Sequence, residues 1–159
     1  MITPVLVAEL LAEGERMPVY VHVIDHPDAR VLVDTGLTQL HPAVADMDPR
    51  LTPLSAQADF DLAGIDLVVN THLHFDHCGG NHLFSGKPIY VQRQELDDAR
   101  SQDDYTIREW VDFPGATYAE HEGDLWQEGG TGAPTRTFIR FLERRSSGRS
   151  SARARNARR

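Results

Sequence analysis

The chain has 159 residues, of which 40% are hydrophobic and 25% are charged. This length supports one core of ordinary size, and no stretch approaches the roughly 18 consecutive apolar residues that a membrane-spanning helix needs. The N-terminal residues lack the basic start and cleavage site of a signal peptide, and the single cysteine, Cys78, excludes an intramolecular disulfide. We therefore expect a soluble, cytoplasmic protein with one folded domain.

The charge changes sign along the chain. The net charge is −8, but residues 1–123 carry 7 Lys and Arg against 21 Asp and Glu, whereas residues 124–159 carry 9 Arg against 3 acidic residues. Hydrophobic periodicity is also lost from Gly123 onward, so this part cannot bury enough apolar surface to offset the entropy of ordering. We expect a folded domain over residues 1–122 and a disordered, arginine-rich tail over residues 123–159.

The first third of the chain predicts strands. TPVLV favours a strand within residues 1–11. The β-branched runs at 19–24 and 29–34, joined by an HPD turn signal, predict a hairpin. The sequence Asp34-Thr35-Gly36 predicts a tight turn at the end of that hairpin. Residues 41–62 are rich in Pro, Asp and Ala, and predict a loop with a short helix.

The next part alternates strand and helix. Residues 65–70 predict a buried strand, 79–81 a turn, 88–91 another strand and 93–100 a polar surface helix. The acidic run at 95–104 is interpreted as a solvated helix face. Together these elements indicate a mixed α/β (α+β) fold.

Three histidines and an aspartate stand within six consecutive positions, in the sequence THLHFDHCGG. The chain has only 8 histidines in all. Because residues two apart in an extended segment point the same way, His72 and His74 can converge on one ion, and Asp76 and His77 can face a second ion beyond the turn. Neutral imidazole and carboxylate suit zinc, with iron, manganese or cobalt as substitutes. The adjacent Cys78 is expected to be buried by packing rather than to bind metal.

THLHFDHCGGN resembles the His-x-His-x-Asp-His signature of the metallo-β-lactamase-fold hydrolases. VLVDTGL, GGN and IYVQRQEL make residues 17–122 similar to the N-terminal half of the N-acyl-homoserine lactonase branch. The resemblance implies half of an αββα sandwich with a two-metal site. It also implies that His72 and His74 bind the first metal, that Asp76 and His77 bind the second, and that Asp34 supports them, unless Asp34 is simply a turn residue.

The same resemblance implies a chemistry. Two divalent ions lower the pKa of a bridging water, and the resulting metal-bound hydroxide would open a lactone ring. Asp76 would hold the nucleophile and pass a proton to the leaving alkoxide. The alternatives are a thioester hydrolase of the glyoxalase II type, a β-lactam hydrolase, and a non-enzymatic protein that binds nucleic acid through its arginine-rich tail.

A complete site of this family also needs two further histidines and a bridging aspartate, the first of them in a Pro-Gly-His loop about sixty residues beyond His77. No histidine follows His121. Codons for residues 135–141, read one base later, permit Pro-Gly-His-Ser-Ser-Gly, with the histidine straddling Thr137 and Phe138. We therefore expect residues 123–159 to be an out-of-frame product and the chain as it stands to be inactive, with a natural basic tail as the alternative.

Overall fold

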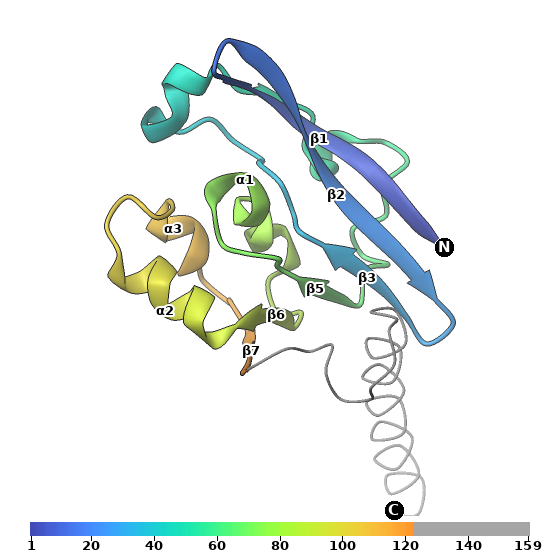
Figure 1. The fold of residues 1–159 in the computed structure, drawn as a ribbon. Helices are drawn as coiled ribbons and strands as arrows, with labels where there is room; N and C mark the ends of the chain where they lie inside the picture. The colour runs from blue at the N-terminus through green and yellow to red at the C-terminus, as the bar shows by residue number, and fades with distance from the viewer. Residues whose placement is uncertain (123–159) are drawn as a thin grey trace, which may run out of the picture.

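The structure is a computed structural model, and it describes residues 1–122 (Figure 1). The disordered, out-of-frame tail predicted for residues 123–159 lies outside the described residues. No helix in the described part of the chain is both long enough and apolar enough to span a lipid bilayer.

The described residues form a seven-stranded sheet with the strand order β4-β1-β2-β3-β5-β6-β7. Its first part is antiparallel, whereas β3, β5, β6 and β7 run parallel to one another. The strands are β1 (Ile2–Ala12), β2 (Glu15–His26), β3 (Ala29–Val33), β4 (Arg50–Leu51), β5 (Leu67–Val69), β6 (Ile89–Gln92) and β7 (Tyr118–His121).

Helices in this part of the chain are short. The three α-helices are α1 (Phe75–Cys78), α2 (Arg93–Ser101) and α3 (Arg108–Val111), and the three 3₁₀ helices are η1 (Pro42–Met47), η2 (Leu54–Ala56) and η3 (Asn81–Phe84). The three α-helices lie together, with α2 in contact with β6 and β7 and α3 in contact with α1 and α2 (Figure 1). They cover one face of the parallel strands.

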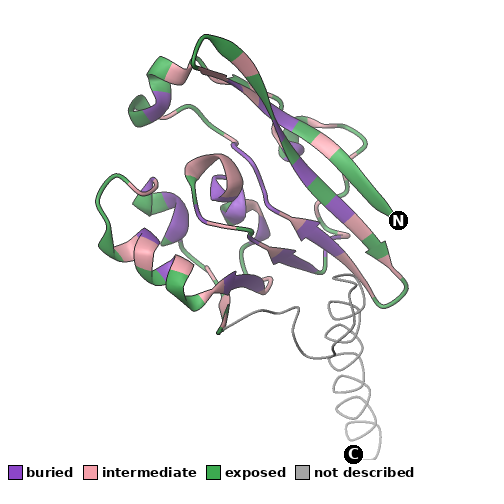
Figure 2. Cartoon of the chain, in the orientation of Figure 1, coloured by how far each residue is buried: buried purple, intermediate pink, exposed green. Residues whose placement is uncertain are grey.

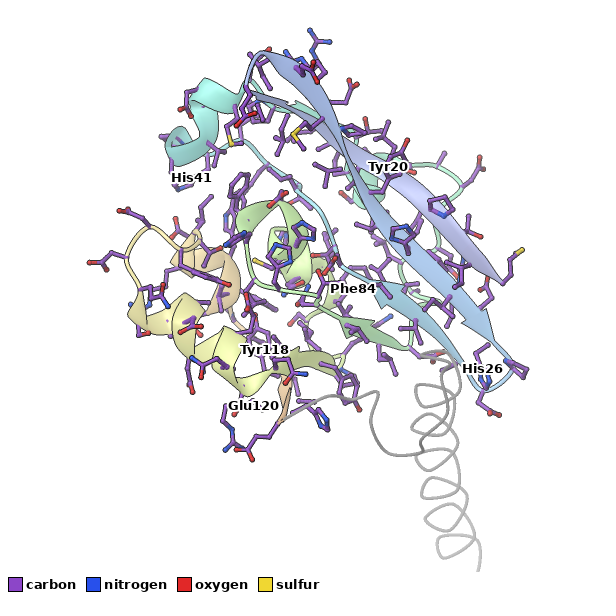
Figure 3. All side chains as sticks on the ribbon, viewed as in Figure 1. Tyr20, His26, His41, Phe84, Tyr118 and Glu120 are labelled. Carbon is purple, nitrogen blue, oxygen red and sulfur yellow. The ribbon has the colours of Figure 1, made fainter. Side chains whose placement is uncertain are left out.

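The core follows from alternation along the strands. Val21 and Val23 of β2 are buried, while Tyr20, the neighbour of Val21 in the same strand, is 45% exposed. Successive side chains of a strand point to opposite faces of the sheet. Figure 2 shows the buried residues running through β3, β5 and β6 and along the inner sides of the helices. Phe84 of η3 is fully buried and lies centrally, and Tyr20 lies on the outer side of β2 (Figure 3). The helical layer therefore packs on one face of the sheet.

Most predicted elements are confirmed. The strand near the N-terminus, the hairpin, the strands near 65–70 and 88–91 and the helix after Gln92 are all present. Residues 41–62 differ from the prediction, because they form two 3₁₀ helices and the two-residue strand β4 instead of one short helix. The predicted turn at 79–81 is the junction between α1 and η3.

Candidate metal centre

The candidate site is at the carboxyl ends of two neighbouring parallel strands. Val33 of β3 pairs with Val69 of β5, and the Asp34 N–H donates to the Val69 carbonyl at 2.8 Å. The chain leaving β3 and the chain leaving β5 therefore emerge side by side. Ligands of α/β sheets are commonly bound at this edge. The prediction that the histidine cluster follows the end of a strand is confirmed.

Asp34 links the two strand ends. Its carboxylate accepts hydrogen bonds from the Thr71 N–H (2.8 Å), the Thr71 hydroxyl (2.8 Å) and His77 Nδ1 (2.9 Å). It is only 5% exposed, so these three donors compensate for burying a charged group. Its φ of 61° is left-handed, a conformation that Asp tolerates better than most residues. Asp34 is therefore more than a turn residue, because it orients one imidazole of the cluster.

The ring of His72 lies against the rings of both His74 and His77. The ring centroids of His72 and His74 are 4.7 Å apart, and those of His72 and His77 are 3.9 Å apart. Asp76 Oδ2 lies 3.5 Å from His77 Nε2. With Nδ1 of His77 donating to Asp34, Nε2 is the nitrogen left to face Asp76. The structure thus brings together all four side chains that the sequence singled out.

Two of the imidazoles differ in their tendency to protonate. The pKa of His72 is lowered by burial and by repulsion from the neighbouring His77 and His74. Burial also acts to lower the pKa of His77, but the hydrogen bond and negative charge of Asp34, together with Asp76, outweigh it and raise that pKa. A neutral imidazole is the form that binds a metal, so His72 is the more readily available donor near neutral pH.

Helix α1 rests directly on the turn that follows β3. The Thr35 N–H donates to the His77 carbonyl at 2.8 Å, and the Thr35 hydroxyl donates to Asn81 Oδ1 at 2.8 Å. Gly80 makes this contact possible, because a Cβ there would lie 2.6 Å from the Thr35 carbonyl oxygen. Asn81 also donates to Asn70 Oδ1 at 2.8 Å. This buried polar network fixes α1, which carries Asp76 and His77, against the turn that follows β3.

Helix α2 contributes a second carboxylate. Glu95 Oε1 accepts a hydrogen bond from the Leu73 N–H at 2.7 Å, and it also accepts one from the Tyr105 hydroxyl. The pKa of Tyr105 is raised, first by burial and then by this bond to Glu95, so the hydroxyl stays protonated and donates. The interpretation of residues 95–104 as a solvated helix face is therefore wrong for Glu95, which reaches across 22 residues to the histidine segment.

The donors in this cluster are of the kind that zinc prefers, namely imidazole nitrogen and carboxylate oxygen. Yet no three His, Cys, Asp or Glu side chains among residues 1–122 are arranged to hold a metal ion. Cys78 adds no ligand, because it is fully buried, its Sγ donates to the Leu73 carbonyl at 3.3 Å, and burial raises its pKa to about 12. The described residues therefore fit a metal in kind but supply an incomplete set of ligands.

The supporting residues Thr71, Glu95 and Tyr105 were not assigned a role from the sequence. The Thr-x-x-x-x-x-His spacing is not a known signal, and Glu95 and Tyr105 approach the cluster only through tertiary packing. The five histidines outside the cluster remain apart from it. His22 and His26 lie on β2, His41 precedes η1 and bonds Glu109, His82 is exposed on η3, and His121 ends β7.

A mixed sheet with a His-x-His-x-Asp-His turn at its strand ends defines a protein with the fold of the metal-dependent hydrolases. The family model of the metallo-beta-lactamase superfamily matches residues 14–145, which is most of the chain, and the chain belongs to this superfamily. The match extends past residue 122, into the part that lies outside the described residues.

Several relatives carry the name N-acyl homoserine lactonase. The chain is 28% identical to the one from Bacillus cereus over 125 residues, which is 68% of this chain and 49% of the relative. It is 28% identical over 144 residues to the lactonase AttM of Rhizobium johnstonii, covering 77% of this chain and 55% of that one. The chain thus spans about half the length of the curated relatives it matches.

Solved structures agree with this relationship. An N-acyl homoserine lactone hydrolase with the product N-hexanoyl-L-homoserine bound at its catalytic metal centre superposes with a TM-score of 0.61 at 25% identity, over 81% of this chain and 61% of that one. A quorum-quenching N-acyl homoserine lactone hydrolase gives a TM-score of 0.59 at 26% identity, over 77% and 56%. The prediction of the metallo-β-lactamase fold and of the lactonase resemblance is confirmed.

Proposed function

We propose that this chain carries part of the active site of a metal-dependent hydrolase that opens the lactone ring of N-acyl homoserine lactones. The observation that carries the proposal is the convergence of His72, His74, Asp76 and His77 at the ends of β3 and β5, with Asp34 2.9 Å from His77 Nδ1. The names of the relatives support the choice of substrate. Zinc is the metal proposed, since imidazole and carboxylate suit it.

His72 and His74 would hold one ion, and Asp76 and His77 a second. When bound, such a pair of ions lowers the pKa of a water towards neutrality and polarises the ester carbonyl. Asp34 would fix the Nδ1–H tautomer of His77, which leaves Nε2 as the donor. Asp76 is partly exposed on the first turn of α1, where its carboxylate would orient the attacking water, accept a proton from it and pass that proton to the leaving alkoxide.

We further propose that the remaining ligands come from outside residues 1–122, since the described residues do not complete a metal site. The chain as it stands would then hydrolyse lactones far more slowly than a version in which residues from 123 onward are read one base later. The gene sequence around those codons checks this directly: a downstream aspartate and histidine in the shifted frame are expected. A shifted frame without them would contradict the proposal.

Turnover distinguishes the candidate substrates. Zinc-loaded protein with the restored frame is assayed for ring opening of N-hexanoyl homoserine lactone, for hydrolysis of a glutathione thioester and for hydrolysis of a β-lactam. Lactone hydrolysis that falls about 100-fold or more in Asp76→Asn is expected, since this change removes a group that acts on the reacting atoms. The matched control His82→Ala, which removes an exposed imidazole outside the cluster, is expected to leave turnover unchanged. Activity on the thioester without activity on the lactone would overturn the choice of substrate.

The nucleic-acid alternative depends on the arginines after residue 135, which lie outside the described residues. DNA binding that weakens steeply as the salt concentration rises from about 50 to about 200 mM, and that disappears when residues 136–159 are deleted, would favour it over the hydrolase.

A further inference from the structure

Leu73, the residue between the first two histidines, is held on all sides. Its side chain is fully buried with Leu96 and Val111. Its N–H donates to Glu95 Oε1 at 2.7 Å, and its carbonyl accepts from the Cys78 thiol at 3.3 Å. The backbone on both sides of this residue therefore has little freedom to rotate.

Glu95 is connected to the histidines by a second route. The Tyr105 hydroxyl donates to the same oxygen, Glu95 Oε1, that accepts the Leu73 N–H. The ring of Tyr105 in turn packs against the ring of His74, with centroids 4.7 Å apart and the planes inclined at 55°. One carboxylate thus acts on the backbone before His74 and, through Tyr105, on the His74 ring.

We propose that Glu95 and Tyr105 form a positioning pair that holds the His72–His74 segment in its metal-binding orientation. In an extended segment, the side chains of His72 and His74 face the same way only while the peptide groups of Leu73 keep their orientation. A hydrogen bond to a carboxylate is stronger than one to a neutral acceptor, which makes Glu95 an effective restraint on the Leu73 N–H. The inference rests on the proposed function, because it assumes that this segment binds a metal.

The other carboxylates of α2 provide the contrast. Asp97 is exposed on the same helix, and Asp98 accepts a hydrogen bond from Gln94 at 3.0 Å, within the helix. Within the described part of the chain, neither carboxylate is hydrogen-bonded to the histidine segment. Asp97→Ala is therefore the matched control for Glu95→Ala, since both changes remove one acidic side chain from α2.

The experiment compares zinc affinity and the visible spectrum of bound cobalt in the full chain and its variants. Glu95→Ala should weaken zinc binding about 10-fold, the lower end of the range for residues that orient metal ligands, and should change the cobalt spectrum. Glu95→Gln keeps an oxygen that accepts from the Leu73 N–H, and so should restore affinity to within about 3-fold of the parent. Asp97→Ala should match the parent. Tyr105→Phe, which keeps the ring against His74 but loses the hydroxyl, should fall between the two Glu95 variants.

A lower melting temperature in Glu95→Ala with unchanged zinc affinity and cobalt spectrum would show a purely structural role and overturn the inference. If the parent chain takes up neither metal, as its incomplete ligand set would explain, the positioning pair is decided by NMR on the metal-free protein, and the proposed function is decided separately by lactone turnover in the restored-frame protein. In that case the Leu73 amide should exchange with solvent at least about 10-fold faster in Glu95→Ala than in Asp97→Ala, and the contact between Tyr105 and His74 should weaken. Unchanged exchange together with an unchanged contact would overturn the pair independently of the metal.

Discussion

Two carboxylates from different parts of the fold accept hydrogen bonds from the histidine segment, and they restrain it differently. Asp34, at the end of β3, accepts the Thr71 N–H at 2.8 Å, and Glu95, on α2, accepts the Leu73 N–H at 2.7 Å. Asp34 also contacts an imidazole directly, at His77 Nδ1, whereas Glu95 reaches the rings only through the backbone and Tyr105.

The comparison shows how a short strand-end segment presents a row of side chains. Residues 71 and 73 are restrained through their backbone N–H groups, so the alternate residues His72 and His74 are left to face the site. Restraint of the backbone at every second residue therefore helps to orient both imidazoles, and His72 Nδ1 also lies 3.1 Å from the Thr71 hydroxyl oxygen. The following three predictions test how far the Asp34 side and the Glu95 side are independent.

Leu73→Ala should have the largest effect on stability. The side chain is fully buried, and its removal leaves a cavity beneath the histidine segment, so we expect a loss of about 3 kcal/mol in the free energy of unfolding. Urea denaturation measures it, with Leu73→Met as the volume-conserving control, for which about 1 kcal/mol is expected. Equal, small losses in both variants would mean that backbone hydrogen bonds rather than packing hold this side.

Asp34→Ala should cost less stability but more metal affinity. It leaves the Thr71 N–H and His77 Nδ1 without their acceptor, so we expect a loss of about 2 kcal/mol. Because Asp34 contacts a ring directly, zinc affinity should fall about 100-fold, against about 10-fold for Glu95→Ala. Titration with a competing chelator measures the zinc affinity of both variants. Equal losses of zinc affinity in Asp34→Ala and Glu95→Ala would show that direct contact with a ring does not increase the effect of a carboxylate on metal binding. Asp34→Asn, which retains an acceptor, is the control and should lose less zinc affinity than Asp34→Ala.

Thr71→Val should have the smallest effect. It removes the hydroxyl that donates to Asp34 at 2.8 Å while the N–H bond from the same residue remains, so we expect about 1 kcal/mol in thermal or urea unfolding. Thr71→Ser keeps the hydroxyl and is the control. A loss in Thr71→Val as large as that in Asp34→Ala would indicate that the hydroxyl, rather than the N–H, is the main partner of Asp34.

The sequence predicted the parts of the molecule that have a local signal. The β2–β3 hairpin, β5, β6 and α2 each have a run of β-branched or polar residues bounded by turn residues. The four-residue α3 is too short to show helical periodicity, and β7 is defined by its pairing with β6 rather than by its own composition. The two-residue β4 was likewise missed, because its pairing with β1 decides it.

In the candidate site, too, the residues with a local sequence signal were predicted and those placed by tertiary packing were not. His72, His74, Asp76 and His77 are adjacent in the sequence and were singled out there, and the structure brings them together. Glu95 was interpreted as one member of a solvated acidic run, because composition does not reveal that a helix side chain turns inward to a strand end 22 residues away. Contacts set by tertiary packing leave no local signal.

The buried thiol of Cys78 provides a way to measure local opening of the structure by chemical labelling. It is the only cysteine, it is fully buried under the histidine segment, and its raised pKa, about 12, leaves almost no thiolate at neutral pH. A thiol reagent can therefore reach it only during transient opening of α1. The ratio of its labelling rate to that of a free thiol gives the free energy of that opening, a local measure of how firmly the segment around Leu73 is closed.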